Sequence, residues 1–143
     1  MPARSTFAYG ANMHAEDLRG IAPGVELLGI ATLPDWRIGV TSSGWLGVEP
    51  MPGEVVHGAV FGLGKGDEPL IDAFEAVDRG LYHKAMIEVN ASHGPEETLV
   101  YVPNEPLDGK IRETYLERCI QAAIELGLPE AWREHLRGFR PSA

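Results

Sequence analysis

Glycine and proline divide this chain into short segments. Its 143 residues include 17 glycines and 11 prolines, and neither residue suits the interior of a long helix or of a central strand. They are spread along the whole sequence and are not gathered into a linker, and the chain has no internal repeat. We therefore expect many short elements within a single domain over residues 1–143.

Most of the apolar segments between these breaks are strand-like, and they lie too close together for regular βαβ units. The expected strands are Thr6–Tyr9, Val25–Thr32, Trp36–Thr41, Val55–Leu63, Tyr82–Val89 and Leu99–Val102. A turn at Leu33-Pro34-Asp35 would separate the second strand from the third. Thr41–Pro52 is expected to be a loop around the apolar piece Trp45–Val48.

Helical signals are fewer than strand signals. Met13–Gly20 is long enough for one or two turns, and Asp67 is suited to cap a central helix that ends near Val77. Ile111–Leu126 has apolar residues at helical spacing, and a last short helix is expected from Pro129 to about Arg137. The expected fold class is therefore α+β, with a small mixed, barrel-like sheet, one central helix and a C-terminal helical tail.

The overall charge argues against several classes of partner. The formal net charge is −9 and no cluster of Lys and Arg occurs, so nucleic acid is not an expected partner. No apolar run is long enough for a signal peptide or a membrane span. Cys119 is the only cysteine, which excludes an internal disulfide and fits a cytoplasmic location. The histidines lack ligand spacing, so we expect no metal and no other cofactor.

The first candidate motif is the end of the first expected strand, Phe7–Met13. A strand that ends in a glycine turn at Gly10 exposes successive backbone N–H groups, which can bind a carboxylate or a developing oxyanion. The same residues also suit an ordinary strand end in which Asn12 supports a turn. Taken alone, the ordinary strand end is the better interpretation.

The second candidate is Glu75 in the central helix. Leu70, Ile71, Phe74 and Val77 are expected to share one apolar helix face. Glu75 borders this face, and a carboxyl group partly withdrawn from water has a raised pKa and can exchange protons near neutrality. A glutamate at a helix edge whose carboxylate reaches solvent fits the same position.

Three further features carry weaker signals. Gly62-Leu63-Gly64-Lys65-Gly66 mimics a nucleotide-binding turn, but Asp67 stands where the third glycine should be. Cys119 lies on the apolar stripe of its helix and is expected in the core. Tyr82 and Tyr101 lie on expected strands, where either can pack in the core or direct a hydroxyl group into a pocket.

Taken together, these segments resemble the γ-glutamyl cyclotransferase superfamily over nearly the whole chain. Tyr9-Gly10-Ala11-Asn12-Met13 is similar to its Y-G-S-N-L/M loop, and Pro52–Phe61 to its P-G-x-x-V-x-G-x-V-(F/W) strand. Ile71–Tyr82 is similar to the L-D-x-x-E-G-v-x-x-G-x-Y segment that carries the family's catalytic glutamate. Leu99–Val102 and the tail from Tyr115 to Pro129 match a later strand and the terminal helices.

The resemblance implies a reaction and a set of site residues. The α-amine of a γ-glutamyl compound attacks its own γ-carbonyl and releases 5-oxoproline and a free amine, without a cofactor. Glu75 would be the catalytic general acid and base. The residues implied in substrate binding are Tyr9, Gly10, Ala11, Asn12, Met13, Tyr82 and Tyr101. Ala11 replaces the family's serine and Ala76 replaces its glycine, which bears on the choice of substrate.

Other functions remain open from the sequence. The released group can be an amino acid, a polyamine or a biosynthetic intermediate, and the protein can be a monomer or a homodimer. An alternative is a non-catalytic protein that binds a small ligand or regulates through the same fold. A nucleotide-binding module through Gly62–Gly66 is a weaker third interpretation.

Overall fold

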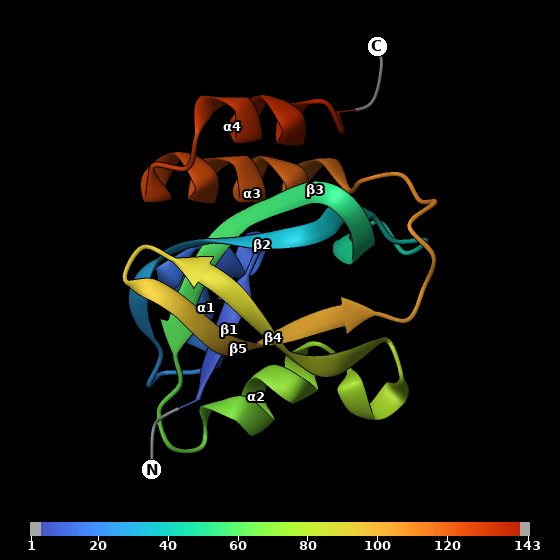
Figure 1. Ribbon diagram of the computed structural model, residues 1–143. Coiled ribbons are helices and arrows are strands. Elements are labelled where there is room, and N and C mark those ends of the chain that lie inside the picture. The colour runs from blue at the N-terminus through green and yellow to red at the C-terminus, as the bar shows by residue number, and fades with distance from the viewer. Residues whose placement is uncertain (1–3, 141–143) are drawn as a thin grey trace.

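Five strands form a closed barrel in the computed structural model of this chain, which describes residues 4–140 (Figure 1). The strands are β1 (Ser5–Ala8), β2 (Glu26–Val40), β3 (Leu46–Gly62), β4 (Tyr82–Ala91) and β5 (Gly94–Pro103). Their order around the barrel is β1-β3-β2-β4-β5, and β1 closes it by pairing in parallel with β5. The other pairs are antiparallel. The α+β class and the barrel-like sheet expected from the sequence are confirmed.

The helices lie around this barrel. They are η1 (Ala11–Met13), α1 (Ala15–Ile21), α2 (Asp67–Phe74), η2 (Val77–Arg79), α3 (Glu113–Leu126) and α4 (Glu130–Arg137), where η marks a 3₁₀ helix. Figure 1 shows α3 and α4 stacked over the long β2–β3 hairpin, with α2 at the other end. None of the helices within residues 4–140 is long and apolar enough to cross a membrane.

The β2–β3 hairpin is longer than the sequence predicted. The turn expected at Leu33-Pro34-Asp35 is wrong, because β2 runs through these residues with a shift in register and Asp35 adopts a positive φ of 65°. Asp35 Oδ1 compensates for the lost pairing by accepting the N–H of Gly53 at 3.0 Å. The loop expected over Thr41–Pro52 is also wrong beyond residue 45, because β3 begins at Leu46.

The central helix differs from its prediction at both ends. Gly66, with φ of 87°, is the N-cap and Asp67 is the first helical residue, so Asp67 does not cap the helix. The helix ends at Phe74 and not near Val77. The expected apolar face is only partly buried, because Leu70 is 46% exposed and Phe74 is 57% exposed, while Ile71 is buried. Leu70 and Phe74 therefore do not join the barrel core.

Gly58 allows β3 to lie close to β1. The candidate site is at the end of β1. The two strands pair from Ser5 opposite Gly62 to Ala8 opposite Ala59. A Cβ atom on Gly58 would lie 2.2 Å from the carbonyl oxygen of Ala8, so only glycine fits there. Steric crowding therefore explains why the last position of the P-G-x-x-V-x-G pattern, Gly58, is a glycine.

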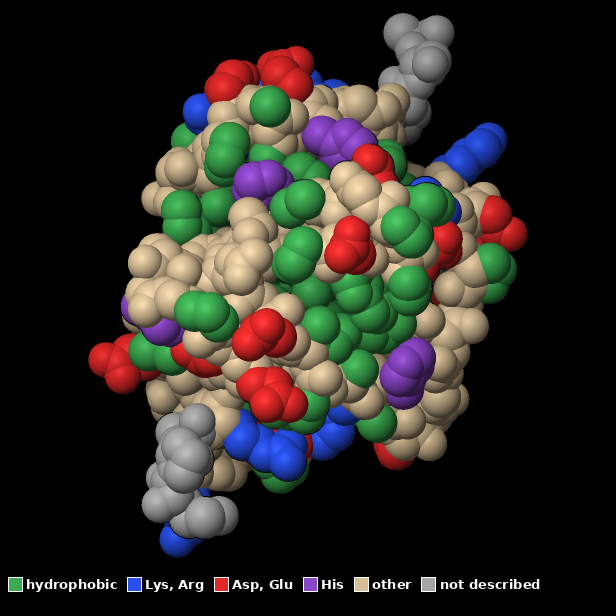
Figure 2. Space-filling view, viewed as in Figure 1, with side chains coloured by type: hydrophobic (Ala, Val, Ile, Leu, Met, Phe, Trp, Pro, Cys, Tyr) green, Lys and Arg blue, Asp and Glu red, His purple; other side chains and the backbone are tan. Residues whose placement is uncertain are grey.

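The surface combines acidic groups with exposed apolar ones. On the face shown in Figure 2, hydrophobic side chains gather between the β2–β3 hairpin and the β4–β5 pair, with acidic side chains around them. The acidic groups agree with the net charge of −9. Large apolar residues that are exposed in the structure are Leu27, Leu28, Ile30, Met51, Val55, Leu70, Phe74, Met86 and Ile124.

Candidate active site

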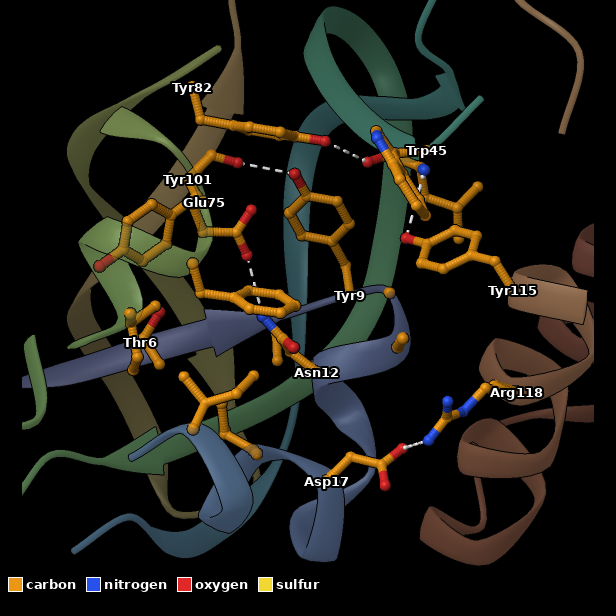
Figure 3. A pocket seen from close by; sticks show the side chains of 18 of the residues that line it. Thr6, Tyr9, Asn12, Asp17, Trp45, Glu75, Tyr82, Tyr101, Tyr115 and Arg118 are labelled. Carbon is orange, nitrogen blue, oxygen red and sulfur yellow. Dashed lines mark hydrogen bonds and ion pairs between the residues drawn. The ribbon is translucent and has the colours of Figure 1, made fainter. Parts of the chain in front are cut away.

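A cavity of about 1050 Å³ lies at the end of β1, between α1, the α2–η2 junction and the start of α3 (Figure 3). Seven of the eight residues predicted for the site line it: Tyr9, Gly10, Ala11, Asn12, Glu75, Tyr82 and Tyr101. The eighth, Met13, is the last residue of η1; it is 1% exposed and packs in the core. The structure thus brings together segments that are more than 60 residues apart, since Asn12 and Glu75 are separated by 63 positions.

The turn after β1 presents backbone donors to the cavity. Within the described residues, the N–H groups of Gly10, Ala11 and Asn12 donate to no protein acceptor, whereas the next two N–H groups close the η1 turn on Gly10 and Ala11. Unpaired N–H groups at a cavity wall can bind a carboxylate or an oxyanion. A Cβ atom at Gly10 would lie 2.6 Å from the hydroxyl oxygen of Tyr115, so any other residue there would have to displace that hydroxyl group.

Glu75 follows the last residue of α2, and its carboxyl group is held at the cavity wall. Its Oε1 accepts a hydrogen bond of 2.9 Å from the side-chain amide of Asn12 (Figure 3). Burial raises the pKa of Glu75 from 4.5 to about 7, although the hydrogen bond from Asn12 acts in the opposite direction. A carboxyl group with this pKa can both accept and return a proton near neutrality.

Ala76 turns the chain sharply behind Glu75. It adopts a left-handed conformation with φ of 54° and ψ of 43°, and its side chain is buried. This conformation favours glycine, which explains the glycine in the family's pattern, and it costs an alanine about 1 kcal/mol. The turn ends α2 and directs the following residues into η2.

Two tyrosine hydroxyl groups near Glu75 donate hydrogen bonds to backbone carbonyl oxygens. Tyr9 donates to the carbonyl oxygen of Tyr101 at 2.6 Å. Tyr82 donates to the carbonyl oxygen of Leu46 at 3.2 Å. Burial first, and the charge of Glu75 in addition, raise the pKa values of both tyrosines, so both hydroxyl groups remain protonated. Both tyrosines are nearly inaccessible, yet both line the cavity.

The hydroxyl group of Tyr101 is engaged elsewhere. It donates to Asp72 Oδ1 at 2.7 Å, and Figure 3 shows it pointing away from the Glu75 carboxyl group. Lys84 binds the other oxygen of Asp72 at 2.9 Å and Glu68 at 2.7 Å. The ring of Tyr101 therefore forms a cavity wall, while its hydroxyl group anchors β5 to α2.

Sequence reasoning missed the wall contributed by α3 and β3. The sequence places Tyr115 only on a helix stripe, but its hydroxyl oxygen accepts the N–H of Leu46 at 3.3 Å and its ring packs edge-on against Trp45 at 5.0 Å. Arg112 lies over the Trp45 ring at 4.2 Å. Asp17 pairs with Arg118 at 2.6 Å. No short motif marks these contacts, because each joins segments distant in sequence.

The glycine-rich turn at Gly62–Gly66 lies outside the lining of this cavity. Asp67 is buried, and its carboxylate accepts the N–H groups of Gly64 at 2.7 Å and Gly24 at 3.1 Å. The chain's own carboxylate thus occupies the donors that a phosphate would need. In residues 4–140, no group of three or more acidic, histidine or cysteine side chains converges to hold a metal ion.

Known proteins share both sequence and fold with this chain. The sequence pattern of the AIG2-like family matches residues 55–136. Proteins named gamma-glutamylcyclotransferase from Homo sapiens and Mus musculus are each 27% identical over 147 residues, covering 95% of this chain and 78% of the relative. A solved structure titled gamma-glutamyl cyclotransferase superimposes with a TM-score of 0.91 at 22% identity, covering 98% of this chain and 89% of that one.

Proposed function

The chain belongs to the AIG2-like family and to the γ-glutamyl cyclotransferase superfamily, and on this basis we propose that it converts a small γ-glutamyl compound to 5-oxoproline and a free amine. The observation that carries the proposal is the Glu75 carboxyl group, with its pKa raised to about 7, held by Asn12 in a cavity of about 1050 Å³. Residues 1–143 would act as one domain, and we propose a cytoplasmic location.

Glu75 would supply proton transfer in this reaction. The α-amine of the substrate is largely protonated at neutral pH and cannot attack a carbonyl until it loses a proton. Glu75 takes that proton as the nitrogen attacks the γ-carbon, and it returns a proton to the leaving nitrogen as the amide bond breaks. A group with a pKa of about 7 suits both steps.

The turn after β1 would stabilise the charge that develops on the substrate. The free N–H groups of Gly10, Ala11 and Asn12 can bind the oxyanion or the glutamyl carboxylate. One well-placed donor of this kind contributes about 3–4 kcal/mol to catalysis. Ala11 keeps its N–H group although it lacks the hydroxyl group of the family's serine. The walls of the cavity would fold the substrate so that its nitrogen meets its carbonyl.

The test is release of 5-oxoproline from a panel of γ-glutamyl amino acids and amines. We expect turnover by the wild type and a loss of at least about 100-fold in kcat for Glu75→Gln, in line with the contribution of general acid–base catalysis. Glu88→Gln is the matched control, because Glu88 is exposed on β4 and outside the lining of the cavity.

The outcomes separate the alternatives. Full activity of Glu75→Gln would remove Glu75 as the base and leave the reaction standing. Absence of turnover with every substrate, in a folded wild type, would contradict the enzymatic function and favour a protein that only binds its ligand.

A further inference from the structure

Helix α2, which leads directly into Glu75, has little apolar contact with the barrel. Ile71 is its only buried apolar side chain, whereas Leu70 and Phe74 are exposed. At the start of the helix, the buried carboxylate of Asp67 accepts two backbone N–H groups. Glu75 lies at the opposite end, where one apolar side chain is not enough to fix the last turn. Polar contacts must therefore contribute to its position.

Two carboxylates of α2 bind side chains from β4 and β5. Asp72 Oδ1 accepts the hydroxyl proton of Tyr101 at 2.7 Å, and Asp72 Oδ2 binds Lys84 Nζ at 2.9 Å. Glu68 Oε2 binds the same ammonium group at 2.7 Å. Glu68 and Asp72 are four positions apart on the helix, where two carboxylates repel each other. Lys84 neutralises both, so these four residues, the α2 clamp, hold α2 against the β4–β5 pair.

The α2 clamp is partly withdrawn from water. The side chain of Lys84 is 28% exposed, and its hydrogen bonds to Glu68 and Asp72 raise its pKa, so it remains charged. Arg4 also binds Glu68, at 3.1 Å, but its side chain is 56% exposed. Exposed ion pairs contribute little to stability. Lys84 and Tyr101 are therefore the contacts that can hold the helix.

The α2 clamp lies within one helical turn of Glu75. Asp72 precedes Glu75 by three positions, and the N–H of Glu75 closes the last turn on the carbonyl oxygen of Ile71 at 2.9 Å. Tyr101 joins the clamp to the cavity, because its ring lines the cavity while its hydroxyl group points away from the Glu75 carboxyl group (Figure 3). A displacement of this turn would move Glu75 away from Asn12.

We propose that Asp72, Lys84 and Tyr101 are positioning residues, which hold the last turn of α2 so that the Glu75 carboxyl group stays in the cavity against Asn12. Without these contacts the turn moves outward, water reaches the carboxyl group, and the hydrogen bond of 2.9 Å from Asn12 is lost. The consequence for catalysis rests on the proposed function, whereas the position of Glu75 does not.

The pKa of Glu75 reports this position. Burial raises it from 4.5 to about 7, so a more exposed Glu75 titrates at lower pH. The titratable groups that face Glu75 are Tyr9, Tyr82 and Tyr101. Burial raises the pKa values of all three, so they stay neutral while Glu75 titrates. A change in the pKa of Glu75 therefore reflects its surroundings and not their titration.

The experiment is an NMR titration of the Glu75 carboxyl carbon, whose signal is assigned by its absence in Glu75→Gln. We expect the pKa of Glu75 to fall by at least about 0.5 pH unit in Tyr101→Phe and by about 1 pH unit in Lys84→Met. The sign is decisive for Lys84→Met, because loss of a positive charge alone would raise the pKa of a carboxyl group. Lys84→Arg keeps the charge and should restore most of the wild-type value.

Arg4→Met is the matched control, because it also removes a positive charge bound to Glu68, but an exposed one. It should leave the pKa of Glu75 unchanged. Folded Tyr101→Phe and Lys84→Met proteins with lower melting temperatures and a wild-type pKa of Glu75 would overturn the positioning role. A rise in that pKa would overturn it as well. If Lys84→Met does not fold, Tyr101→Phe, which keeps the aromatic ring, decides alone.

Activity provides the second measurement. Under the proposed function, we expect kcat for release of 5-oxoproline to fall by about 10-fold in Lys84→Met, because Glu75 is misplaced. The acidic limb of the pH profile should move by the same amount as the pKa measured by NMR. A shifted pKa in a protein that releases no 5-oxoproline would keep the α2 clamp and remove the proposed reaction. Turnover with an unshifted pKa would do the reverse.

Discussion

Burial and hydrogen bonding shift the pKa of the Glu75 carboxyl group in opposite directions. Withdrawal from water favours the neutral acid, whereas the amide of Asn12 at 2.9 Å favours the carboxylate. Burial is the larger effect, so the pKa rises to about 7. A stronger set of donors would hold the group ionised at all physiological pH values and would weaken it as a base.

This pKa shift has a cost in stability that depends on pH. The unfolded chain releases the Glu75 proton near pH 4.5 and the folded chain near pH 7, so the folded state holds more protons in this window. The contribution of Glu75 to stability is therefore complete below pH 4.5 and is lost as the pH rises to 7. The difference amounts to about 3 kcal/mol.

Glu75→Gln should remove this pH dependence. The glutamine side chain cannot ionise, and it can still accept the hydrogen bond of Asn12 through its amide oxygen. We expect the unfolding free energy of the variant, relative to the wild type, to rise by about 3 kcal/mol between pH 4 and pH 8. Urea unfolding at both pH values measures it, and other titrating groups cancel in the difference. The same difference at both pH values would contradict the raised pKa.

At the scale of elements, β3 is fixed to β1 by the absence of a side chain at Gly58. A Cβ atom at this position would meet the backbone oxygen of Ala8 at 2.2 Å, and backbone atoms cannot move aside as a side chain can. The strand that carries the candidate site would have to shift away from β3. The position of the site therefore depends on a residue outside the lining of the cavity.

Gly58→Ala should destabilise the protein by about 3 kcal/mol, at the upper end of the cost of overpacking. Gly62→Ala is the matched control on the same strand, because its Cβ atom would make an ordinary contact of 3.5 Å with Leu28. We expect the control to change the unfolding free energy by less than about 0.5 kcal/mol. Thermal unfolding of both variants decides the matter, and equal melting temperatures would show that β1 and β3 can separate at little cost.

The elements also show why the sequence predicted some features and not others. Alternating apolar residues identified most strands, because that pattern depends only on local burial. Pro34-Asp35 is a strong turn signal, yet β2 continues, because Asp35 recovers a hydrogen bond from Gly53 on the partner strand. The end of α2 was missed because Ala76, which gives no signal of a left-handed turn, adopts one.

The candidate site also contains residues that the sequence predicted and residues that it did not. Glu75 and the turn at Gly10–Asn12 were identified through the resemblance to a known family, and the structure brings Asn12 and Glu75 into contact. Tyr115 was missed because its role depends on a helix that meets β3 only in the folded chain. Long-range contacts of this kind leave no periodic pattern in the sequence.

At the scale of the whole molecule, the barrel is closed by a narrow seam. Within residues 4–140, the only residue pair in register between β1 and β5 is Thr6 with Leu99. Side chains reinforce it, because Ser5 donates to the hydroxyl oxygen of Thr98 at 3.0 Å and Thr6 donates to the carbonyl oxygen of Leu99 at 3.1 Å. Ser5, Thr6 and Thr98 are all buried, so water cannot replace these bonds.

Thr98→Val should therefore weaken the closure of the barrel. The change keeps the shape of the side chain but removes the acceptor of the Ser5 hydrogen bond. Because the Ser5 hydroxyl group can still bond to the Glu96 carboxylate, we expect a cost of about 0.5–1.5 kcal/mol. Thr32→Val on β2 is the control, because Thr32 is only partly buried and makes no side-chain hydrogen bond within the described part of the chain. The unfolding free energies of the two variants are compared in urea. Equal values would show that the seam does not need this bond.

The residues that line the cavity extend from Thr6 in β1 to Arg118 in α3. A ribosome that has delivered only the first hundred residues has therefore produced the base and most of its neighbours, but not the Tyr115 wall that encloses them. The pocket can form only after α3 has left the exit tunnel. The activity proposed for this protein would thus appear only once α3 has emerged, and no truncated translation product that stops before α3 would carry it.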